Sequence, residues 1–308
     1  MTRFILGTNT CFATNRWPEP EAWARVISQE MGLGSVQLVS DLINPFWPEA
    51  ALKRQTERVL EAISKYDLEI HSLMTGGFTR LNHLMYPHSE LRQVWFDWFK
   101  RFIDLGSQLG VRAVGSHFGI LSFQDLEDEV RRRTRVAEAV RLWQDLTFYA
   151  QDLGIEYLFF ETMSIPREMA YTIEEARDLY ERVNAHCGVP MRLCLDVGHA
   201  PHPAQRDPYL WLHELGHLAP IVHLQQTEYG HSRHWPFTPE YNARGIIDPQ
   251  RVLDTISATG IPEVWLGFEI AHRERFEEEA RVLPDLRASA AYWKQFLPPN
   301  SPRRSRPA

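Results

Sequence analysis

The sequence predicts a (β/α)8 barrel, and three observations carry this prediction. Eight short, mostly apolar segments recur along the chain, each followed by a helix. In five places an amphipathic helix ends in glycine and runs directly into one of these segments, as in "AQDLGIEYLFFE". No GxGxxG or Walker-type glycine loop follows any segment, which argues against the rival fold, a doubly wound sheet.

The eight predicted strands are short and continuously apolar, as expected for strands covered on both faces. In chain order they are residues 3–11, 35–39, 68–73, 111–117, 155–162, 191–199, 221–227 and 264–270.

The predicted helices carry apolar residues at three- and four-residue spacing. They include residues 21–32, 51–66, 93–110, 132–154, 172–188 and 249–260. Two of these helices have clear start signals, Thr172 before "IEEA" and Asp248 followed by Pro249. At the helix ends, glycine is expected to take a positive φ that lets the chain turn back. These glycines are Gly32, Gly110, Gly154, Gly188 and Gly260.

The composition favours one domain and a small-molecule partner. The chain has 308 residues, 44% of them hydrophobic, which fits a single barrel domain over residues 1–298. Residues 299–308 are expected to form a disordered tail. The net charge of −7 argues against nucleic acid, and no apolar run is long enough for a signal peptide or membrane helix. We expect a cytoplasmic protein, and aromatic residues in "RQVWFDWFKRF" are consistent with a homo-oligomer.

Polar residues gather at the carboxyl ends of the predicted strands, the face where barrels of this kind carry their active sites. In chain order they are Asn9, Cys11, Gln37, Asp41, His71, His117, Glu161, Asp196, His199, His223, Gln225, Glu269 and His272. The stretch "IVHLQQTEYGHSRHW" at residues 221–235 is the richest in such groups.

Four of these residues indicate a metal site. Glu161, Asp196, His223 and Glu269 belong to four consecutive strands, so they converge at one point of the barrel mouth. One such acid could form an ordinary salt bridge, but three buried carboxylates with a histidine are expensive without a cation. The set suits Mn²⁺, Mg²⁺, Co²⁺ or Fe²⁺, and we expect Mn²⁺. A structural zinc site would require cysteines, which are absent there.

The same four residues, with His199 three positions after Asp196, resemble the sugar-phosphate isomerase/epimerase family, the xylose-isomerase-like TIM barrels that include the ketose 3-epimerases. The resemblance spans nearly the whole chain, from "LGTNTCF" to "LGFEI". It implies that the four residues bind the metal, that Glu161 and Glu269 are the acid/base pair, and that His199 touches substrate. The run "HLQQT" with the later "HWPFT" is similar to a subgroup of tetrulose-phosphate epimerases of erythritol breakdown.

The family often has a glutamate on the second strand, where this chain has Gln37, so a substrate contact there is expected to be altered. The substrate-binding residues predicted besides His199 are Gln225, His71, His117, Arg233, His234 and Trp235. Arg233 suits a phosphate or carboxylate, although it could equally be a solvated loop charge. His71 and His117 could equally be hydrogen-bonded core histidines.

These expectations define an isomerase of carbohydrate metabolism. We expect a metal-dependent epimerase of a short-chain ketose or ketose phosphate, with erythrulose phosphate as a candidate. A proton would leave and return at the carbon beside the ketone, through an enediolate that the metal stabilises. The alternatives are an aldose–ketose isomerase and a lyase or decarboxylase of a keto-sugar acid. An apurinic-type endonuclease would require more metal ligands and a basic face, and the acidic net charge argues against it.

Overall fold

A computed structural model describes residues 2–76, 81–200, 202–274 and 279–298. Its strands are β1 (Arg3–Asn9), β2 (Ser35–Val39), β3 (Glu69–Met74), β4 (Ala113–His117), β5 (Tyr157–Glu161), β6 (Met191–Asp196), β7 (Ile221–Leu224) and β8 (Glu263–Phe268). Its α-helices are α1 (Pro20–Arg25), α2 (Glu49–Lys65), α3 (Ser89–Gln108), α4 (Phe123–Glu127), α5 (Glu129–Asp152), α6 (Ile173–Asn184), α7 (Pro208–Leu215), α8 (Pro239–Asn242), α9 (Pro249–Ala258) and α11 (Val282–Lys294).

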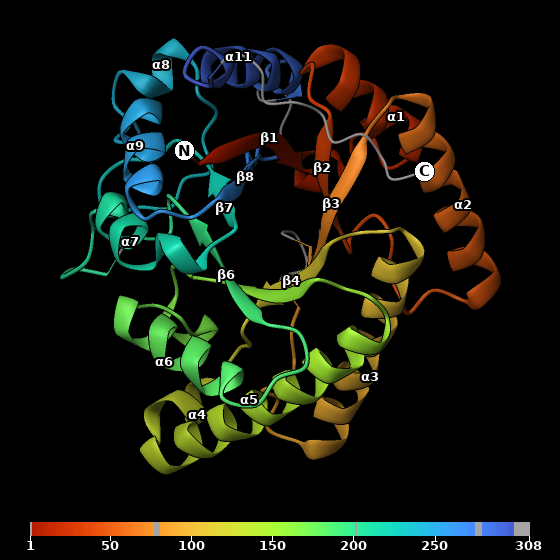
Figure 1. Ribbon diagram of the computed structural model, residues 1–308, viewed down its shortest axis with the longest axis vertical. Helices are drawn as coiled ribbons and strands as arrows, with labels where there is room; N and C mark the ends of the chain where they lie inside the picture. The colour runs from red at the N-terminus through yellow and green to blue at the C-terminus, as the bar shows by residue number, and fades with distance from the viewer. Residues whose placement is uncertain (1, 77–80, 201, 275–278, 299–308) are drawn as a thin grey trace.

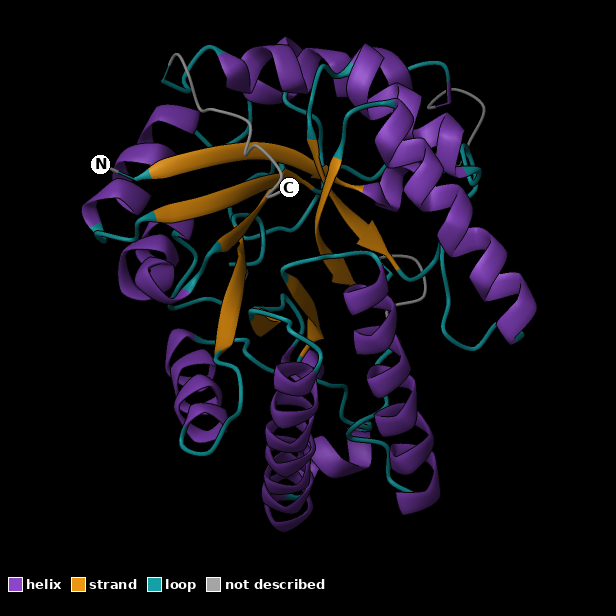
Figure 2. Cartoon of the chain, turned by 45° about the vertical axis from the view of Figure 1, so that its right-hand side comes forward, coloured by secondary structure: helices purple, strands orange, loops and turns teal. Residues whose placement is uncertain are grey.

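The eight strands form one closed barrel in the order β1 to β8, and every neighbouring pair is parallel, including β1 with β8. The strands lie at the centre with the helices around them (Figure 1), and the view turned by 45° shows the same arrangement (Figure 2). The predicted (β/α)8 barrel is therefore confirmed. All carboxyl ends of the strands lie at one end of this barrel, which brings distant parts of the sequence together.

The helix signals read from the sequence are largely confirmed. Thr172 accepts a hydrogen bond from the amide of Glu175, and Asp248 accepts one from the amide of Arg251. Four glycines that end helices have positive φ: Gly32 (60°), Gly110 (67°), Gly154 (74°) and Gly260 (76°).

Gly188 was predicted wrongly as a helix-ending glycine. Helix α6 ends at Asn184, and Gly188 does not take a positive φ. A Cβ at Gly188 would lie 2.6 Å from Phe148 Cα and 2.8 Å from the Thr147 carbonyl oxygen. The close approach of this loop to α5 is what requires glycine.

The lower part of the barrel is filled mainly with apolar side chains. The inner cluster consists of Met74, Ala113, Tyr157, Phe159, Cys194, Ile221 and Trp265. Two of its aromatic rings pack against glycine backbone: a Cβ at Gly267 would lie 1.9 Å from Trp265 Cζ3, and one at Gly115 would lie 2.4 Å from Phe159 Cδ2. A second, larger apolar layer joins the outer faces of the strands to the helices.

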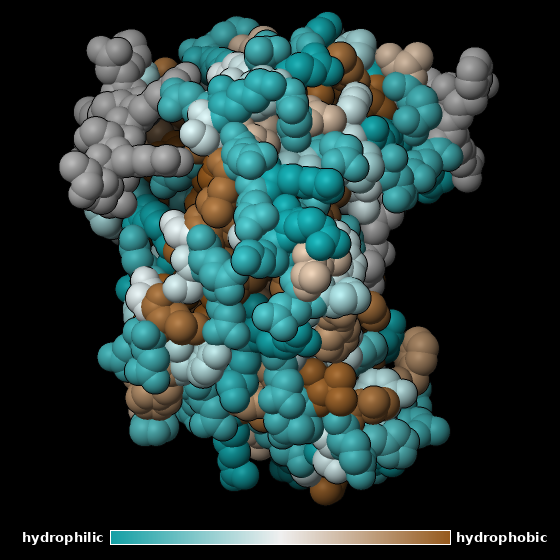
Figure 3. Space-filling view, turned by 90° about the vertical axis from the view of Figure 1, so that its right-hand side faces the viewer, coloured by the Kyte–Doolittle hydropathy of each residue, from teal (hydrophilic) through white to brown (hydrophobic). Residues whose placement is uncertain are grey.

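The molecular surface is mostly hydrophilic on the face that Figure 3 shows, with small separate hydrophobic patches. Across the described residues, no helix is long and apolar enough to span a membrane. The predicted disordered tail, residues 299–308, lies outside the described residues, so the domain boundary at residue 298 stays a prediction.

Candidate active site

Four side chains from consecutive strands meet at the barrel mouth. Glu161 is the last residue of β5, Asp196 is the last of β6, His223 lies in β7, and Glu269 directly follows β8. One potential ligand atom from each lies within 4.8 Å of those of the other three, and all four residues are buried. The structure therefore brings together the four residues that the sequence predicted as metal ligands.

Strand register explains this convergence. Asp196 pairs with His223 across β6 and β7, and His223 pairs with Gly267 across β7 and β8. The amide of Glu269 donates to the Leu224 carbonyl, which continues the ladder one step past the end of β8. Gly267 has no side chain, and the ring of Trp265 occupies the space where one would lie.

His223 lies between the two glutamates. Its Nδ1 is 2.8 Å from Glu161 Oε1 and 3.2 Å from Glu269 Oε2. Asp196 Oδ1 accepts hydrogen bonds from the Gly198 amide at 2.6 Å and from Gln225 Nε2 at 2.9 Å. Within the described residues, Asp196 Oδ2 and Glu269 Oε2 are buried and accept no hydrogen bond.

This donor set fits a divalent cation. Buried carboxylate oxygens without hydrogen-bond donors are costly, and a cation satisfies them directly. Three carboxylates and one imidazole are ligand types that Mn²⁺, Mg²⁺, Co²⁺ and Fe²⁺ accept. The cluster is thus a possible metal site whose atoms are all within reach of one central position.

The electrostatics of the two glutamates differ. Burial, together with the neighbouring charge of Glu269, raises the pKa of Glu161. Burial alone would also raise the pKa of Glu269, but the charge of His223, together with those of His234 and His199, outweighs burial and lowers that pKa. The surroundings therefore shift the pKa values of the two carboxyl groups in opposite directions.

His199 and His234 lie beside the cluster, as predicted for substrate-binding residues. His199 Nδ1 is 2.9 Å from the Thr162 carbonyl oxygen, and its Nε2 is 3.8 Å from Asp196 Oδ2. His234 Nδ1 is 3.0 Å from the Glu269 carbonyl oxygen. The two rings contact each other edge to face, with centroids 5.5 Å apart.

Gln225, also predicted to contact substrate, uses its amide within the protein. Its Oε1 accepts the amides of Arg233 at 3.0 Å and His234 at 2.5 Å, while its Nε2 donates to Asp196. These contacts join the loop after β7 to the β6 carboxylate. A substrate contact by Gln225 stays a prediction.

The other four predicted substrate residues have contacts of their own. His71 stacks on Trp265 inside the barrel at a centroid distance of 5.1 Å, and His117 is buried at the end of β4 beside Glu161. The Arg233 guanidinium is ion-paired with Glu228. The Trp235 ring packs on Tyr241, with Arg233 and Arg244 over its face.

Gln37 is a site residue whose contact the sequence did not reveal. It is fully buried, and its Oε1 lies 2.9 Å from His223 Nε2. Gln37 thus contacts the histidine of the cluster, and the altered substrate contact expected at this position stays a prediction. A lone amide within the apolar strand "SVQLV" was the available signal, because a buried amide requires partners.

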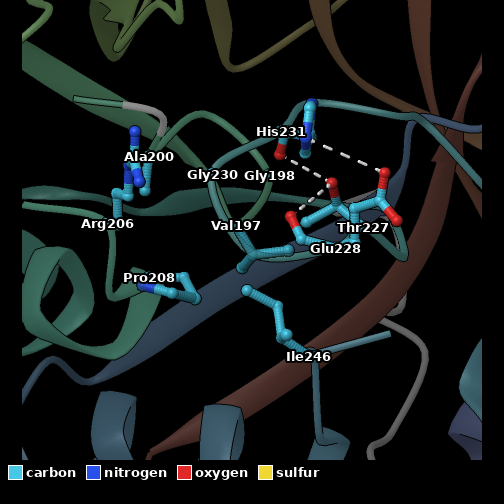
Figure 4. Close-up of a pocket in the computed structure, with 10 residues that line it drawn as sticks. All are labelled: Val197, Gly198, Ala200, Arg206, Pro208, Thr227, Glu228, Gly230, His231 and Ile246. Atoms are coloured by element: carbon cyan, nitrogen blue, oxygen red, sulfur yellow. Dashed lines mark hydrogen bonds and ion pairs between the residues drawn. The ribbon is translucent and has the colours of Figure 1, made fainter. Parts of the chain in front are cut away.

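A separate pocket lies beside the loops that follow β6 and β7 (Figure 4). Its polar lining includes Arg206, Glu228 and His231, while Gly198 and Gly230 form part of its backbone wall. None of the four cluster residues lines it. The pocket is therefore not lined by the cluster.

The fold and the cluster define a class of protein: a (β/α)8 barrel with a carboxylate–imidazole centre at its mouth. The profile of the xylose isomerase-like TIM barrel family matches residues 26–290, and the chain belongs to this family. A D-erythrulose 1-phosphate 3-epimerase of Brucella abortus (strain 2308) is 32% identical over 297 residues, which are 95% of this chain and 96% of that protein. The chain is an enzyme of the isomerase class, as the sequence predicted.

Solved structures agree with this assignment. A crystal structure from Rhodospirillum rubrum ATCC 11170, provisionally named a xylose isomerase, has a TM-score of 0.87 and 30% identity, covering 97% of this chain and all of that one. A D-allulose 3-epimerase from Methylomonas sp. has a TM-score of 0.72 and 15% identity, covering 96% of this chain and 99% of its own. The second likeness shows the shared fold.

Proposed function

We propose that this enzyme epimerises a short ketose phosphate at the carbon next to the ketone, with D-erythrulose 1-phosphate as the first candidate substrate. The observation that carries the proposal is the pair of buried glutamates, Glu161 and Glu269, which meet at His223 from two strands on different sides of the mouth. The relationship to the Brucella epimerase over nearly the whole chain supports the choice of substrate.

Epimerisation requires one group that removes a proton from one face of the substrate and another that returns a proton to the opposite face. Glu161 and Glu269 have carboxyl groups suited to both tasks. The surroundings shift their pKa values in opposite directions, so the two carboxyl groups differ in acidity, as an acid and a base must. The configuration of the substrate decides which glutamate begins, so either direction of turnover uses the same pair.

Glu161, Asp196, His223 and Glu269 are the residues that would hold the cation, with Mn²⁺ as the first choice. Bound there, the cation would supply Lewis-acid stabilisation of the negative charge that develops as the proton leaves the substrate. His199 and His234, which lie beside the cluster, would contact substrate oxygens. The burial of all four cluster residues keeps bulk water from the developing charge.

Four further substrate contacts are proposed from the sequence alone. His71, His117 and Trp235 would line the sugar, and Arg233 would bind the phosphate. Arg233 would have to exchange its ion pair with Glu228 for the phosphate, which an exposed pair permits at low cost because it contributes little.

Incubation with Mn²⁺ and D-erythrulose 1-phosphate in D₂O, followed by NMR, tests the proposal. We expect deuterium at C3 together with the epimeric ketose phosphate. Label in an aldose would identify an aldose–ketose isomerase. Release of carbon dioxide from a keto-sugar acid, without exchange into any ketose, would identify a lyase and refute the epimerase proposal.

A further inference from the structure

A chain of buried contacts leads from the backbone of the loop after β1 to the ring of His223. The amide of Cys11 donates to Asn9 Oδ1 at 2.8 Å. A backbone N–H can only donate, so this contact fixes which end of the Asn9 side chain is the oxygen. The other end, the Nδ2 amide, therefore points towards Gln37, 2.8 Å away.

The orientation of Asn9 fixes that of Gln37 in turn. Because Asn9 Nδ2 donates, the atom of Gln37 that faces it must be the acceptor Oε1. The Gln37 Nε2 group then points to Ser72 Oγ at 3.1 Å, where a hydroxyl can accept. Gln37 cannot take the opposite orientation, because its Nε2 donor would then face the Nδ2 donor of Asn9.

The orientation of Gln37 determines where His223 carries a proton. Gln37 Oε1 is 2.9 Å from His223 Nε2, so an acceptor faces this ring nitrogen and Nε2 must bear hydrogen. The other nitrogen, Nδ1, faces Glu161 and Glu269. Asn9, Gln37 and His223 are at most 1% exposed, so water does not compete for these contacts.

We propose that Asn9 and Gln37 are positioning residues that hold the proton of His223 on Nε2, which leaves Nδ1 as the nitrogen that binds the divalent cation. This inference rests on the metal site of the proposed function. Residues that orient a histidine ligand through its second ring nitrogen commonly change metal affinity by about 10–100-fold when they are replaced.

Asn9→Asp provides a direct test, because it changes neither Gln37 nor His223. One oxygen of the aspartate still accepts the Cys11 amide, but the other now presents an acceptor to Gln37. Gln37 should reverse, which is tolerated at Ser72 because a hydroxyl can donate as well as accept. The reversed amide presents N–H to His223 Nε2 and opposes a proton there.

Two measurements follow this change. With ring-¹⁵N histidine, the buried Nε2–H of His223, assigned by its absence in His223→Ala, should be a slowly exchanging signal in the wild-type enzyme, with or without diamagnetic Mg²⁺. Asn9→Asp should lose it. Calorimetric titration with Mn²⁺ should show affinity about 10–100-fold weaker in Asn9→Asp.

Variants at Gln37 and Ser72 provide the controls. Gln37→Met removes the acceptor and should weaken Mn²⁺ binding by a similar factor, whereas Gln37→Glu keeps an acceptor and should retain the Nε2–H signal. Ser72→Ala removes the hydrogen bond between Gln37 Nε2 and Ser72 Oγ, but Asn9 still fixes the orientation of Gln37. The Nε2–H signal of His223 and the Mn²⁺ affinity of this variant should therefore match those of the wild type.

Two results overturn the inference: an unchanged Nε2–H signal in Asn9→Asp, or Mn²⁺ affinity within twofold of wild type in both Asn9→Asp and Gln37→Met. Failure of the proposed function can be distinguished from failure of this inference. Wild-type enzyme that binds Mn²⁺ with the Nε2–H signal retained, yet epimerises no ketose phosphate, would refute the function and support the role of Asn9 and Gln37.

Discussion

Gln225 and Gln226 are neighbouring buried glutamines that stabilise different parts of the molecule, and this permits a matched test of the site. Gln225 binds Asp196 and the amides of the loop after β7. Gln226 bonds both the amide and the carbonyl of Ile247, in the segment before α9. We predict that Gln225→Met and Gln226→Met destabilise the fold similarly, but only the former weakens metal binding.

The magnitude follows from the hydrogen bonds that each substitution removes. Each glutamine makes about three good hydrogen bonds, at about 1 kcal/mol net apiece, so each variant should lose about 3 kcal/mol. For a chain of 308 residues with an unfolding entropy of about 2.1 cal/mol/K per residue, this lowers Tm by about 5 °C. Releasing Asp196 should also weaken Mn²⁺ binding by about 10–100-fold in Gln225→Met alone.

Calorimetry measures both quantities, with Tm from thermal scans in EDTA and Mn²⁺ affinity from titration. In Gln226→Met the Mn²⁺ affinity should stay within about twofold of wild type, because the side-chain hydrogen bonds of Gln226 go to Asn242, Thr227 and Ile247 rather than to the cluster. Equal losses of affinity in the two variants, or unchanged affinity in Gln225→Met, would refute the assignment of Gln225 to Asp196.

Four further predictions test the site. His223→Ala should lose Mn²⁺ binding with an unchanged circular dichroism spectrum; bound metal in that variant contradicts its role as a ligand. Glu161→Gln and Glu269→Gln should each lower kcat by about 10²–10⁴-fold in the deuterium-exchange assay, and a full rate in either contradicts its role. EDTA should lower Tm by about 4 °C, since cation at a hundredfold excess over Kd adds about 2.7 kcal/mol, and Mn²⁺ should restore it. Gly198→Ala places a Cβ 2.2 Å from Gln225 Cδ and should weaken Mn²⁺ binding as Gln225→Met does; wild-type affinity contradicts this.

The fold and the four residues of the cluster could be predicted from the sequence, because buried segments and buried acids leave clear patterns in it. A carboxylate at the end of an apolar strand is expensive, so Glu161, Asp196 and Glu269 stand out in "YLFFE", "LCLD" and "LGFE". The parallel barrel then requires these positions to lie at one end. Here, local pattern and global topology agree.

The role of Gln37 could not be predicted, since its partner lies across the barrel. Strands β2 and β7 are not neighbours, and no spacing in the sequence relates Gln37 to His223. The register between β2 and β3 also shifts at Val36 and Gln37, which changes the direction of side chains in a way that alternation does not reveal. Arg233, in contrast, forms an ion pair with Glu228, which lies close to it in the sequence.

Gln37 and Gln225 each orient one residue of the cluster through an uncharged amide. Gln225 holds the carboxylate of Asp196, and Gln37 holds the ring of His223. Both positions need a long side chain that can hydrogen-bond at a buried site, but a glutamate would add negative charge to a cluster that already has three carboxylates. A lysine would supply a competing cation. The uncharged amide orients the proposed ligands without changing the charge available to bind the metal. Replacing either glutamine should therefore lower the metal affinity before it affects other properties.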